Sequence, residues 1–411
     1  MPQTLPPLRP VLDVFPSPDP QQPGLLLRDP MRYSDAILVL PPLWAFALRF
    51  LDGCHTALDV QEELTRAAGE LVTSSDIDEF VGILQTQGFL VTEEFERMRD
   101  RRHAQFRAMP ERQPAHAGTA YPQAPGDLRG AFDGYFETSA APDGFSPSVL
   151  GIAAPHVSPE GGYESYAAAY RPLAAHPELR ERTFVVLGTS HYGQPERFGI
   201  TRKPFVTPYG RVTVDAALAA WLLQRAPGAI TDEDYCHAVE HSIEFQCVFL
   251  QHALGPDVRI LPILCGQFAN SLASGQPPES DEAVARFFDA LGELAERERG
   301  RLFWVLGVDM AHVGRRYGDA LAAVVGEEPM ARVAQDDQRR LESVCAGDAA
   351  AFFEQVKPNG DDLKWCGYSP LYTFLKAVPA ARGRLLRYQQ WNIDPNSVVS
   401  FAGLEFFETP S

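Results

Sequence analysis

Cysteine is scarce in this sequence: the 411 residues include only six, and their positions follow no framework spacing. Disulfide-dependent secreted proteins carry more cysteines at regular spacings, so these six are expected to be free thiols in a reducing compartment. Basic residues are also outnumbered, with 36 Lys and Arg against 54 Asp and Glu and a net charge of −18. The chain therefore lacks the basic footprint that a nucleic-acid partner or an anionic membrane surface requires.

Long apolar runs are absent as well. The longest, Ala36–Leu51, is interrupted by Pro41, Pro42 and Arg49 and is too short to span a bilayer. The opening stretch Met1–Pro23 is rich in proline and has no apolar core of the kind found in signal peptides. These absences predict a cytoplasmic protein with no nucleic-acid and no membrane partner. The apolar fraction of 45% and the charged fraction of 22% are typical of folded domains.

Changes in composition along the chain predict four segments. Residues 1–24 hold many prolines and predict an extended tail. Residues 25–92 combine short strand patterns with three helix patterns, typical of a small winged-helix-like α+β domain. In that domain Ser75-x-x-Asp78 is the expected capping box of the third helix, and Phe89–Thr92 is an expected strand. Residues 93–113 are dense in charges of both signs and predict a solvated linker helix.

Residues 114–411 predict an α/β domain. Four apolar runs have the length and composition of buried strands: Leu150–Ala154, Thr183–Leu187, Arg259–Leu264 and Leu302–Leu306. Helix patterns separate them, so the fold class is α/β, with a largely parallel or mixed sheet covered by helices on both faces. Further strands are expected within Arg384–Phe407, and Ser271–Asp281 predicts a surface loop.

Histidines follow three of these strands directly. His156 and His191 each come just after a strand end, and Asp309 and His312 come after a third. In open α/β sheets ligands bind at the carboxyl ends of the strands, so these side chains are expected to meet there. Neutral imidazole is a common metal ligand, and Cys366, in a glycine-containing turn before a helix, is the candidate third ligand.

A second polar cluster, Glu240-His-Ser-Ile-Glu244, stands at the start of a predicted helix. Polar groups at such a position can be simple helix caps. Read together with His237, the run also matches H-x-x-E-H, the pattern that places two zinc ligands beside a carboxylate base. A zinc peptidase therefore stays open as an alternative at this point.

From His116 to about Gly403 the sequence resembles the Memo family, whose members are often found as component B of AmmeMemoRadiSam gene systems. The resemblance rests on a series of motifs: His116-Ala-Gly-Thr-Ala-Tyr121, Ile152-Ala-Ala-Pro-His156, Leu187-Gly-Thr-Ser-His191, Glu240-His-Ser-Ile-Glu244, Leu261-Pro-Ile-Leu264, Asp309-Met-Ala-His312 and Cys366-Gly367. It implies a fold similar to the class III, LigB-type extradiol dioxygenases, which hold non-haem iron with two histidines and a carboxylate.

The same resemblance implies roles for individual residues. His156, His191 and Cys366 fall where the metal ligands are expected, and His312 falls where the dioxygenases place an acid/base histidine. Asp309 is expected to hold His312. His241 and Glu240 are expected to line the pocket. Because a thiolate replaces the carboxylate and is softer, the implied cofactor is a mononuclear metal ion, iron or copper, with zinc possible.

Residues 25–92 resemble PqqD-like modules, which bind leader peptides. The residues that carry this resemblance are Leu51-Asp-Gly53, Val60-x-x-x-Leu64 and the run from Asp76 to Gly88. A peptide or protein substrate would then add as a strand at the edge of this module's sheet. A generic winged-helix packing role is the alternative. The gene systems of the Memo family further imply a radical SAM enzyme and an AMMECR1-like protein as partners.

Besides the zinc peptidase, two functions remain open from the sequence. The first is a metal-dependent oxidoreductase related to the dioxygenases. The second is a non-catalytic protein that binds peptides or handles metal on an enzyme-derived fold, because a fold does not fix a function. An open pocket at the metal position favours the enzyme.

Overall fold

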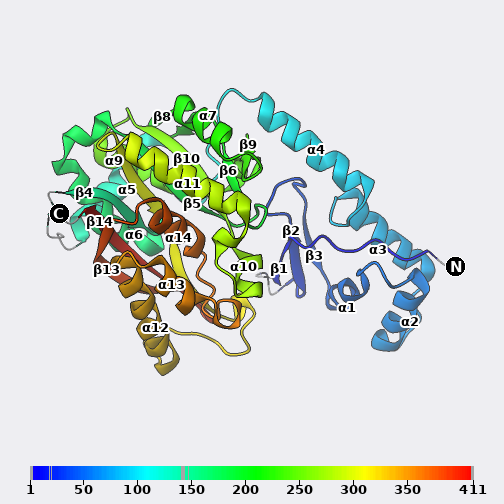
Figure 1. The fold of residues 1–411 in the computed structure, drawn as a ribbon. Coiled ribbons are helices and arrows are strands. Elements are labelled where there is room, and N and C mark those ends of the chain that lie inside the picture. Colours follow the sequence, from blue (N-terminus) through cyan, green and yellow to red (C-terminus); the bar gives the residue numbers. More distant parts are fainter. Residues whose placement is uncertain (1–2, 18, 20, 140–143, 147, 409–411) are drawn as a thin grey trace. The chain divides into compact units, whose positions relative to one another are not determined.

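The computed structural model describes residues 3–17, 19, 21–139, 144–146 and 148–408. The chain divides into two compact units, Met1–Met109 and Pro110–Ser411 (Figure 1). Nowhere in these described ranges is a helix both long and apolar enough to cross a membrane. All six cysteines lie in these ranges and are free thiols.

The first unit packs helices on a small antiparallel sheet of order β1-β2-β3. Its elements are β1 (Asp13–Pro16), β2 (Leu25–Arg28), β3 (Ile37–Leu40), α1 (Pro42–Ala47), the 3-10 turn η1 (Leu48–Phe50), α2 (Ala57–Ala68), α3 (Ser74–Thr86) and α4 (Glu93–Ala108). Apolar residues at helical spacing on α2 and α3, among them Val60, Leu64, Ile77 and Leu84, form its core. Gly88 follows α3 with a φ of +71°, the left-handed conformation that glycine tolerates.

The structure differs from the predictions for this unit in three places. The capping box is Thr73 with Asp76 rather than Ser75 with Asp78. Phe89–Thr92 is not a strand, and within it Leu90 makes only an isolated bridge to Leu8. The Pro-rich segment is packed against the unit rather than standing free, because Leu5 and Leu8 contact its core. Pro18 and Pro20, also part of the expected tail, lie outside the described residues.

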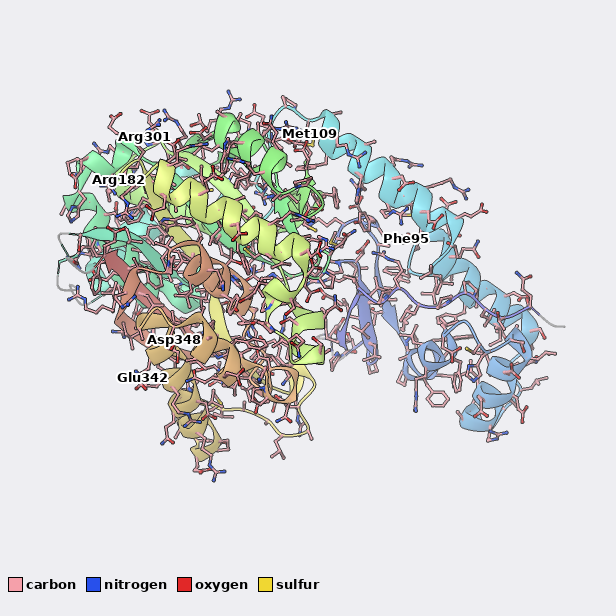
Figure 2. All side chains as sticks on the ribbon, in the orientation of Figure 1. Phe95, Met109, Arg182, Arg301, Glu342 and Asp348 are labelled. Atoms are coloured by element: carbon pink, nitrogen blue, oxygen red, sulfur yellow. The ribbon has the colours of Figure 1, made fainter. Side chains whose placement is uncertain are left out.

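The charged stretch after residue 92 forms α4, which begins with Thr92 as its N-cap. This helix carries Phe95 (Figure 2). The guanidinium carbon of Arg9 lies over the Phe95 ring, 4.1 Å from its centroid. Arg9 is itself buried and forms a two-pronged ion pair with Asp29. Met109 caps the end of the helix and is the last residue of this unit.

The second unit is built on a mixed sheet of order β12-β14-β4-β11-β5-β10-β6-β9, flanked by helices. Its strands are β4 (Val149–Ala154), β5 (Thr183–Ser190), β6 (Phe198–Ile200), β7 (Phe205–Thr207), β8 (Gly210–Val214), β9 (Ile230–Asp232), β10 (Arg259–Gly266), β11 (Leu302–Gly307), β12 (Asp309–Gly314), β13 (Ala381–Asp394) and β14 (Ser397–Glu408). The central strands β4, β11, β5 and β10 are parallel, and β14 pairs antiparallel to β4. The predicted α/β class is confirmed.

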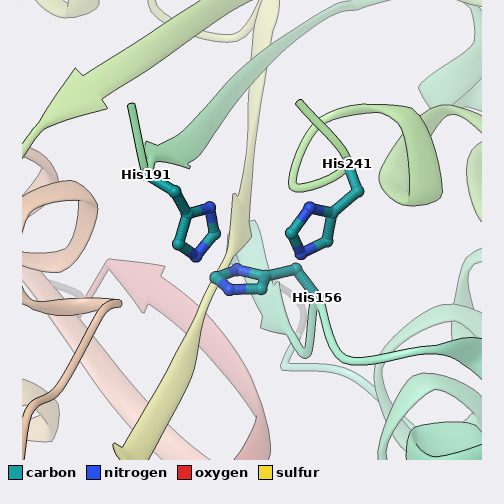
Figure 3. Close-up of side chains that lie close together, drawn as sticks. All are labelled: His156, His191 and His241. Atoms are coloured by element: carbon teal, nitrogen blue, oxygen red, sulfur yellow. The ribbon is translucent and has the colours of Figure 1, made fainter. Parts of the chain in front are cut away.

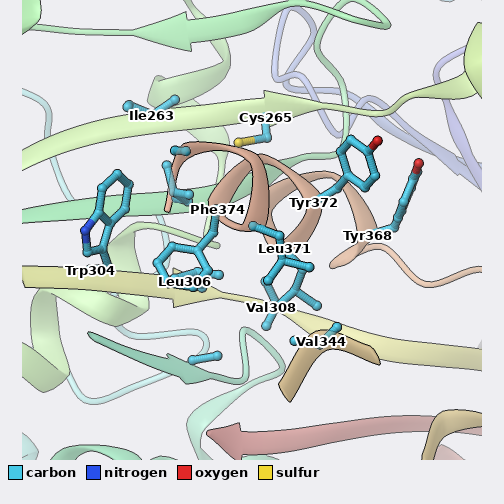
Figure 4. Close-up of a cluster of buried hydrophobic side chains, with 14 of the residues drawn as sticks. Ile263, Cys265, Trp304, Leu306, Val308, Val344, Tyr368, Leu371, Tyr372 and Phe374 are labelled. Atoms are coloured by element: carbon cyan, nitrogen blue, oxygen red, sulfur yellow. The ribbon is translucent and has the colours of Figure 1, made fainter. Parts of the chain in front are cut away.

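Helices connect these strands and cover the sheet. They are α5 (Pro125–Thr138), α6 (Pro159–Tyr170), α7 (Ala216–Arg225), α8 (Cys236–Val239), α9 (Glu244–Leu254), α10 (Ala269–Ser274), α11 (Glu282–Arg297), α12 (Glu328–Cys345), α13 (Ala349–Val356) and α14 (Tyr368–Ala377). Figure 4 shows Leu371 and Phe374 of α14 packed against Trp304 and Leu306 of β11. The predicted loop at 271–281 is in part helical, because α10 extends to Ser274.

Candidate metal centre

Three histidines converge at the carboxyl end of the parallel strands (Figure 3). His156 follows β4, His191 follows β5, and His241 lies in the turn before α9. One ring nitrogen of each lies within 4.8 Å of those of the other two. The ring centroids are 5.0 to 5.2 Å apart, with His191 and His241 stacked and His156 perpendicular to both. This spacing allows one metal ion to be held between the rings.

Two glycines permit this convergence. A Cβ at Gly188 of β5 would lie 2.5 Å from the Ser242 hydroxyl, and one at Gly307 of β11 would lie 2.3 Å from the Ser242 carbonyl. Only glycine allows such a close approach of the turn to the strands. Because Gly188 and Gly307 have no side chains, the turn can pack closely on the strands. His241, the neighbour of Ser242, can therefore lie at the edge of the sheet.

The hydrogen bonds of the rings fix which nitrogen is free. His156 Nδ1 lies 2.9 Å from the Gly307 carbonyl oxygen, which can only accept, so this nitrogen carries the proton. His191 Nδ1 lies 3.0 Å from Oε1 of Glu240 and donates to that carboxylate. Nε2 is therefore the nitrogen of each ring that is left for a metal ion, the arrangement that outer partners impose on histidine ligands of metals. Burial lowers the pKa of His156, but Asp309 and Cys366 outweigh it and raise the pKa to about 9, so without a metal this Nε2 carries a proton that it shares with Cys366.

Glu240 orients two of the three rings rather than merely lining a pocket. Its buried carboxylate accepts the backbone N–H groups of His191 and His241, each at 3.0 Å, and lies 3.1 Å from His241 Nδ1. Burial by itself would raise the pKa of Glu240, but the adjacent His191 and His241 hold it well below its ordinary value. The group is therefore an anion that keeps both imidazoles in place.

Cys366, the third ligand expected from the sequence, lies beside the histidines. Its Sγ is 3.2 Å from His156 Nε2, and the turn that carries it is tied to the sheet by the Gly367 N–H, which donates to the Asp309 carbonyl at 2.9 Å. Burial alone would raise the pKa of this thiol, but His156 and His312 beside it lower the pKa well below its ordinary value. A thiolate next to imidazoles is a ready donor for a metal cation, which would replace the proton they share.

His312 and Asp309 lie on β12, next to this group. His312 Nδ1 donates to the carbonyls of Met310 at 2.9 Å and Lys364 at 3.1 Å, so its Nε2 is left to interact with Cys366. Burial lowers the pKa of His312, but the neighbouring Cys366 outweighs this effect and the net shift is upward. Asp309 accepts the backbone N–H of His156 at 2.9 Å. Two carbonyls therefore hold His312, and Asp309 fixes His156, which differs from the expected pairing of Asp309 with His312.

His237 takes no part in this group. The helix that carries it, α8, ends at Val239, and Glu240 is extended, so His237 and His241 do not share a helix face. His237 Nε2 donates to the Gly199 carbonyl at 3.1 Å, and Glu240 is engaged by His191 and His241. This geometry does not support the zinc peptidase alternative.

A cavity of about 410 Å³ opens beside Cys366. It lies past the carboxyl end of β10, and Phe268, Leu272, Trp365 and Tyr368 form its apolar walls together with Cys366. Its position at the strand ends is where α/β proteins bind their ligands. The cavity therefore reaches the turn that carries Cys366, and its lining does not include His156, His191 or His241.

The sequence predicts His241 as a pocket residue and does not indicate that it belongs to the histidine group. The polar motif Glu240–Glu244 is the only part of the sequence that could have indicated this membership, but residues that cap the start of a helix explain the motif equally well. His116 was likewise overlooked as a neighbour of the centre. Its ring lies 5.5 Å from that of His241 and contacts the Val239 carbonyl through Nε2 at 2.8 Å.

Comparison with known proteins matches residues 112–405 to the family described as Memo-like protein. This match covers more than half of the chain, so the chain belongs to the Memo family. The predicted family is confirmed, and the histidine group and Cys366 lie within the matched region.

Relatives of the chain are named only as MEMO1 family proteins. The one from Aquifex aeolicus is 25% identical over 93% of this chain and 96% of its own length. The one from Thermus thermophilus is 28% identical, covering 82% of this chain and 94% of its own. One from Methanosarcina barkeri is 27% identical over 71% of this chain and 98% of its own length. The Aquifex alignment is long enough to include most of the first unit.

Among solved structures, an uncharacterized protein from Escherichia coli K12 aligns with a TM-score of 0.38 and 12% identity. The alignment covers 62% of this chain and 99% of that protein.

Proposed function

We propose that this Memo family protein binds one metal ion and acts as a mononuclear metal oxidoreductase on a peptide or protein substrate. The ligands would be Nε2 of His156, Nε2 of His191 and Sγ of Cys366, with His241 as a further donor. The observation that carries the proposal is the convergence of these donors at one sheet edge. Imidazole and thiolate together favour iron or copper, and they also suit zinc.

The residues around the donor group support chemistry as well as binding. A bound iron or copper ion would supply redox chemistry and a coordination position for a substrate atom. His312 would hold or deliver a proton at Nε2, because its Nδ1 is committed to two carbonyls. The cavity beside Cys366 would admit the reacting part of the substrate. Component B of an AmmeMemoRadiSam system, with radical SAM and AMMECR1-like partners, is the setting that we propose for this activity.

The first unit supports the peptide part of the proposal. β3 is one of the two edge strands of its sheet, and a groove of about 370 Å³ runs between β3 and α3. Trp44, Phe80 and Ile83 line the groove, and Asp76 and Glu79 give it an acidic side. A PqqD-like module would bind an extended peptide here by strand addition, with apolar side chains in the groove and basic side chains toward the acids.

Placing a positive charge in this groove is expected to weaken peptide binding by about tenfold, or 1.4 kcal/mol, because it removes an apolar wall and competes with the basic side chains of the peptide for Asp76 and Glu79. The variant is Ile83→Lys, measured by fluorescence anisotropy with a labelled peptide that alternates apolar and lysine residues. Leu71→Lys is the matched control, because Leu71 is also exposed on this unit but lies outside the groove. Equal loss in both variants, or no binding by the wild type, would contradict peptide recognition at β3.

The metal part is tested by elemental analysis of protein purified without oxygen, followed by oxygen-uptake assays with and without added peptide. We expect about one equivalent of iron or copper per chain from a single three-donor site. Removing the metal should abolish oxygen uptake. Metal bound without any turnover would instead favour the non-catalytic, metal-handling alternative. A wild type that takes up no iron, copper or zinc on reconstitution would exclude both metal-based functions.

A further inference from the structure

The turn that leads to Cys366 has an unusual backbone. Asn359, Asp361 and Lys364 all have positive φ, at 55°, 70° and 54°. Residues other than glycine adopt this conformation rarely, and it persists only where the surrounding structure holds it in place. Three such residues directly before a thiolate indicate that other parts of the fold constrain this turn.

One constraint comes from Arg340 of α12. Its buried guanidinium pairs with Oδ1 of Asp361 at 2.7 Å, and the other carboxylate oxygen of Asp361 accepts the backbone N–H of Trp365 at 2.6 Å. The same guanidinium lies 5.4 Å from the centre of the Trp365 ring. Arg340 therefore fixes the residue next to Cys366 at its backbone.

A second constraint comes from Asp337, three residues earlier on α12 and fully buried. Its Oδ1 accepts the indole N–H of Trp365 at 2.7 Å. Its Oδ2 accepts the hydroxyl of Tyr388 at 2.7 Å and that of Ser400 at 2.6 Å. Ser400 Oγ in turn accepts the backbone N–H of Ala311, the neighbour of His312, at 2.8 Å. One carboxylate thus links the Cys366 turn to the strand that carries His312.

We propose that Asp337 and Arg340 are positioning residues of the metal centre, which hold Trp365 from two sides and thereby set Cys366 Sγ against His156. The inference rests on the proposed metal-binding function. Residues three apart on a helix share one face, so both groups reach the same turn. Packing alone would not require a buried carboxylate and a buried guanidinium, because apolar residues of similar volume fill such space at no loss of stability. Orienting a ligand does require directed hydrogen bonds.

The test uses Co²⁺ as the probe in the full-length protein, because a cobalt–thiolate bond gives a charge-transfer absorption that reports on Cys366 directly. Asp337→Asn replaces the carboxylate by an amide, which cannot accept all three hydrogen bonds because its NH₂ group is a donor. We expect it to weaken Co²⁺ binding by about 10- to 100-fold, the usual effect of losing a residue that orients a metal ligand. The thiolate absorption should weaken too. Trp365→Phe, which removes the indole N–H together with part of the ring, should show the same change. The double variant should be no weaker than either single one.

Asp336→Asn is the matched control, because Asp336 is the neighbouring residue on α12 and is exposed at the surface. It should bind Co²⁺ as the wild type does. An Asp337→Asn variant that unfolds more easily but keeps wild-type affinity and thiolate absorption would overturn the inference and leave Asp337 a purely structural residue.

A metal-independent measurement separates this inference from the proposed function. Amide hydrogen exchange of the metal-free protein reports on the N–H groups of Trp365 and Gly367, which donate to Asp361 and Asp309. If the wild type binds no Co²⁺, the proposed function fails. Faster exchange at these two amides in Asp337→Asn would still support the positioning role, and unchanged exchange would overturn it.

Discussion

Replacing His156 with alanine is expected to abolish metal binding. His156 belongs to both possible donor sets, His156/His191/Cys366 and His156/His191/His241. It is also the most enclosed ligand, because its ring is buried and held by the Gly307 carbonyl. Loss of a direct ligand should exceed the about 10- to 100-fold weakening that follows loss of an outer partner. Elemental analysis of His156→Ala, purified beside the wild type, measures this directly.

Cys366→Ala and His241→Ala separate the two donor sets. If the thiolate is a ligand, Cys366→Ala should lose the metal while His241→Ala retains most of it. The reverse result would assign the site to the three histidines and remove the main argument for a soft metal. His176→Ala is the control, because His176 lies between two 3-10 turns near the surface and pairs with Glu178. Wild-type metal content in all four variants would contradict a site at this position.

Part of the histidine group could be predicted from the sequence, because His156 and His191, two of the proposed ligands, follow buried strands. Apolar runs predict the strands, and the carboxyl ends of parallel strands lie at one edge of the sheet. Residues that directly follow these strands therefore lie near one another, independently of the conformation of the loops. His156 and His191 could be predicted in this way. Cys366 could not be placed by strand order alone, since it precedes a helix, and the resemblance to the Memo family was needed to include it.

Other features depend on contacts between distant residues and left no clear local signal. The stretch Thr73-Ser-Ser-Asp-Ile-Asp78 contains two possible capping boxes, and the structure uses the earlier one. A proline-rich segment predicts a tail, but its leucines pack because the first unit offers them an apolar surface. His241 lies in the histidine group only because glycines in two separate strands allow its turn to pack closely against the sheet.

Replacing Glu244 with alanine is expected to destabilise the second unit by about 3–5 kcal/mol, the usual result of leaving one member of a buried ion pair alone. Glu244 is fully buried at the start of α9 and pairs with Arg112, which is also buried. It also accepts the Tyr121 hydroxyl and the backbone N–H groups of Ala115 and His116, at 2.9 and 3.0 Å. The carboxylate therefore ties residues 112–121 to the helix that follows His241.

Urea denaturation followed by tryptophan fluorescence measures this loss, because four of the five tryptophans lie in the second unit. Glu282→Ala is the control: Glu282 is almost fully exposed, and its pair with Arg286 should contribute less than about 1 kcal/mol. Combining Arg112→Met with Glu244→Gln should cost less than Glu244→Ala, because no charge is then left unpaired. A double variant as unstable as the single one would show that lost packing, and not the orphaned guanidinium, causes the effect.

The contribution of Glu244 should also depend on pH in a defined direction. Burial would raise the pKa of Glu244, but Arg112 and His116 outweigh it and the net shift is downward. A carboxyl whose pKa is lower in the folded state stabilises the fold above its unfolded pKa of 4.5, and this contribution is lost as the pH falls through the folded value. The stability difference between wild type and Glu244→Gln should therefore be constant near neutral pH and shrink on acidification. A difference that grows as the pH falls would mean that Glu244 is protonated in the native state and that its bond to Arg112 is not an ion pair.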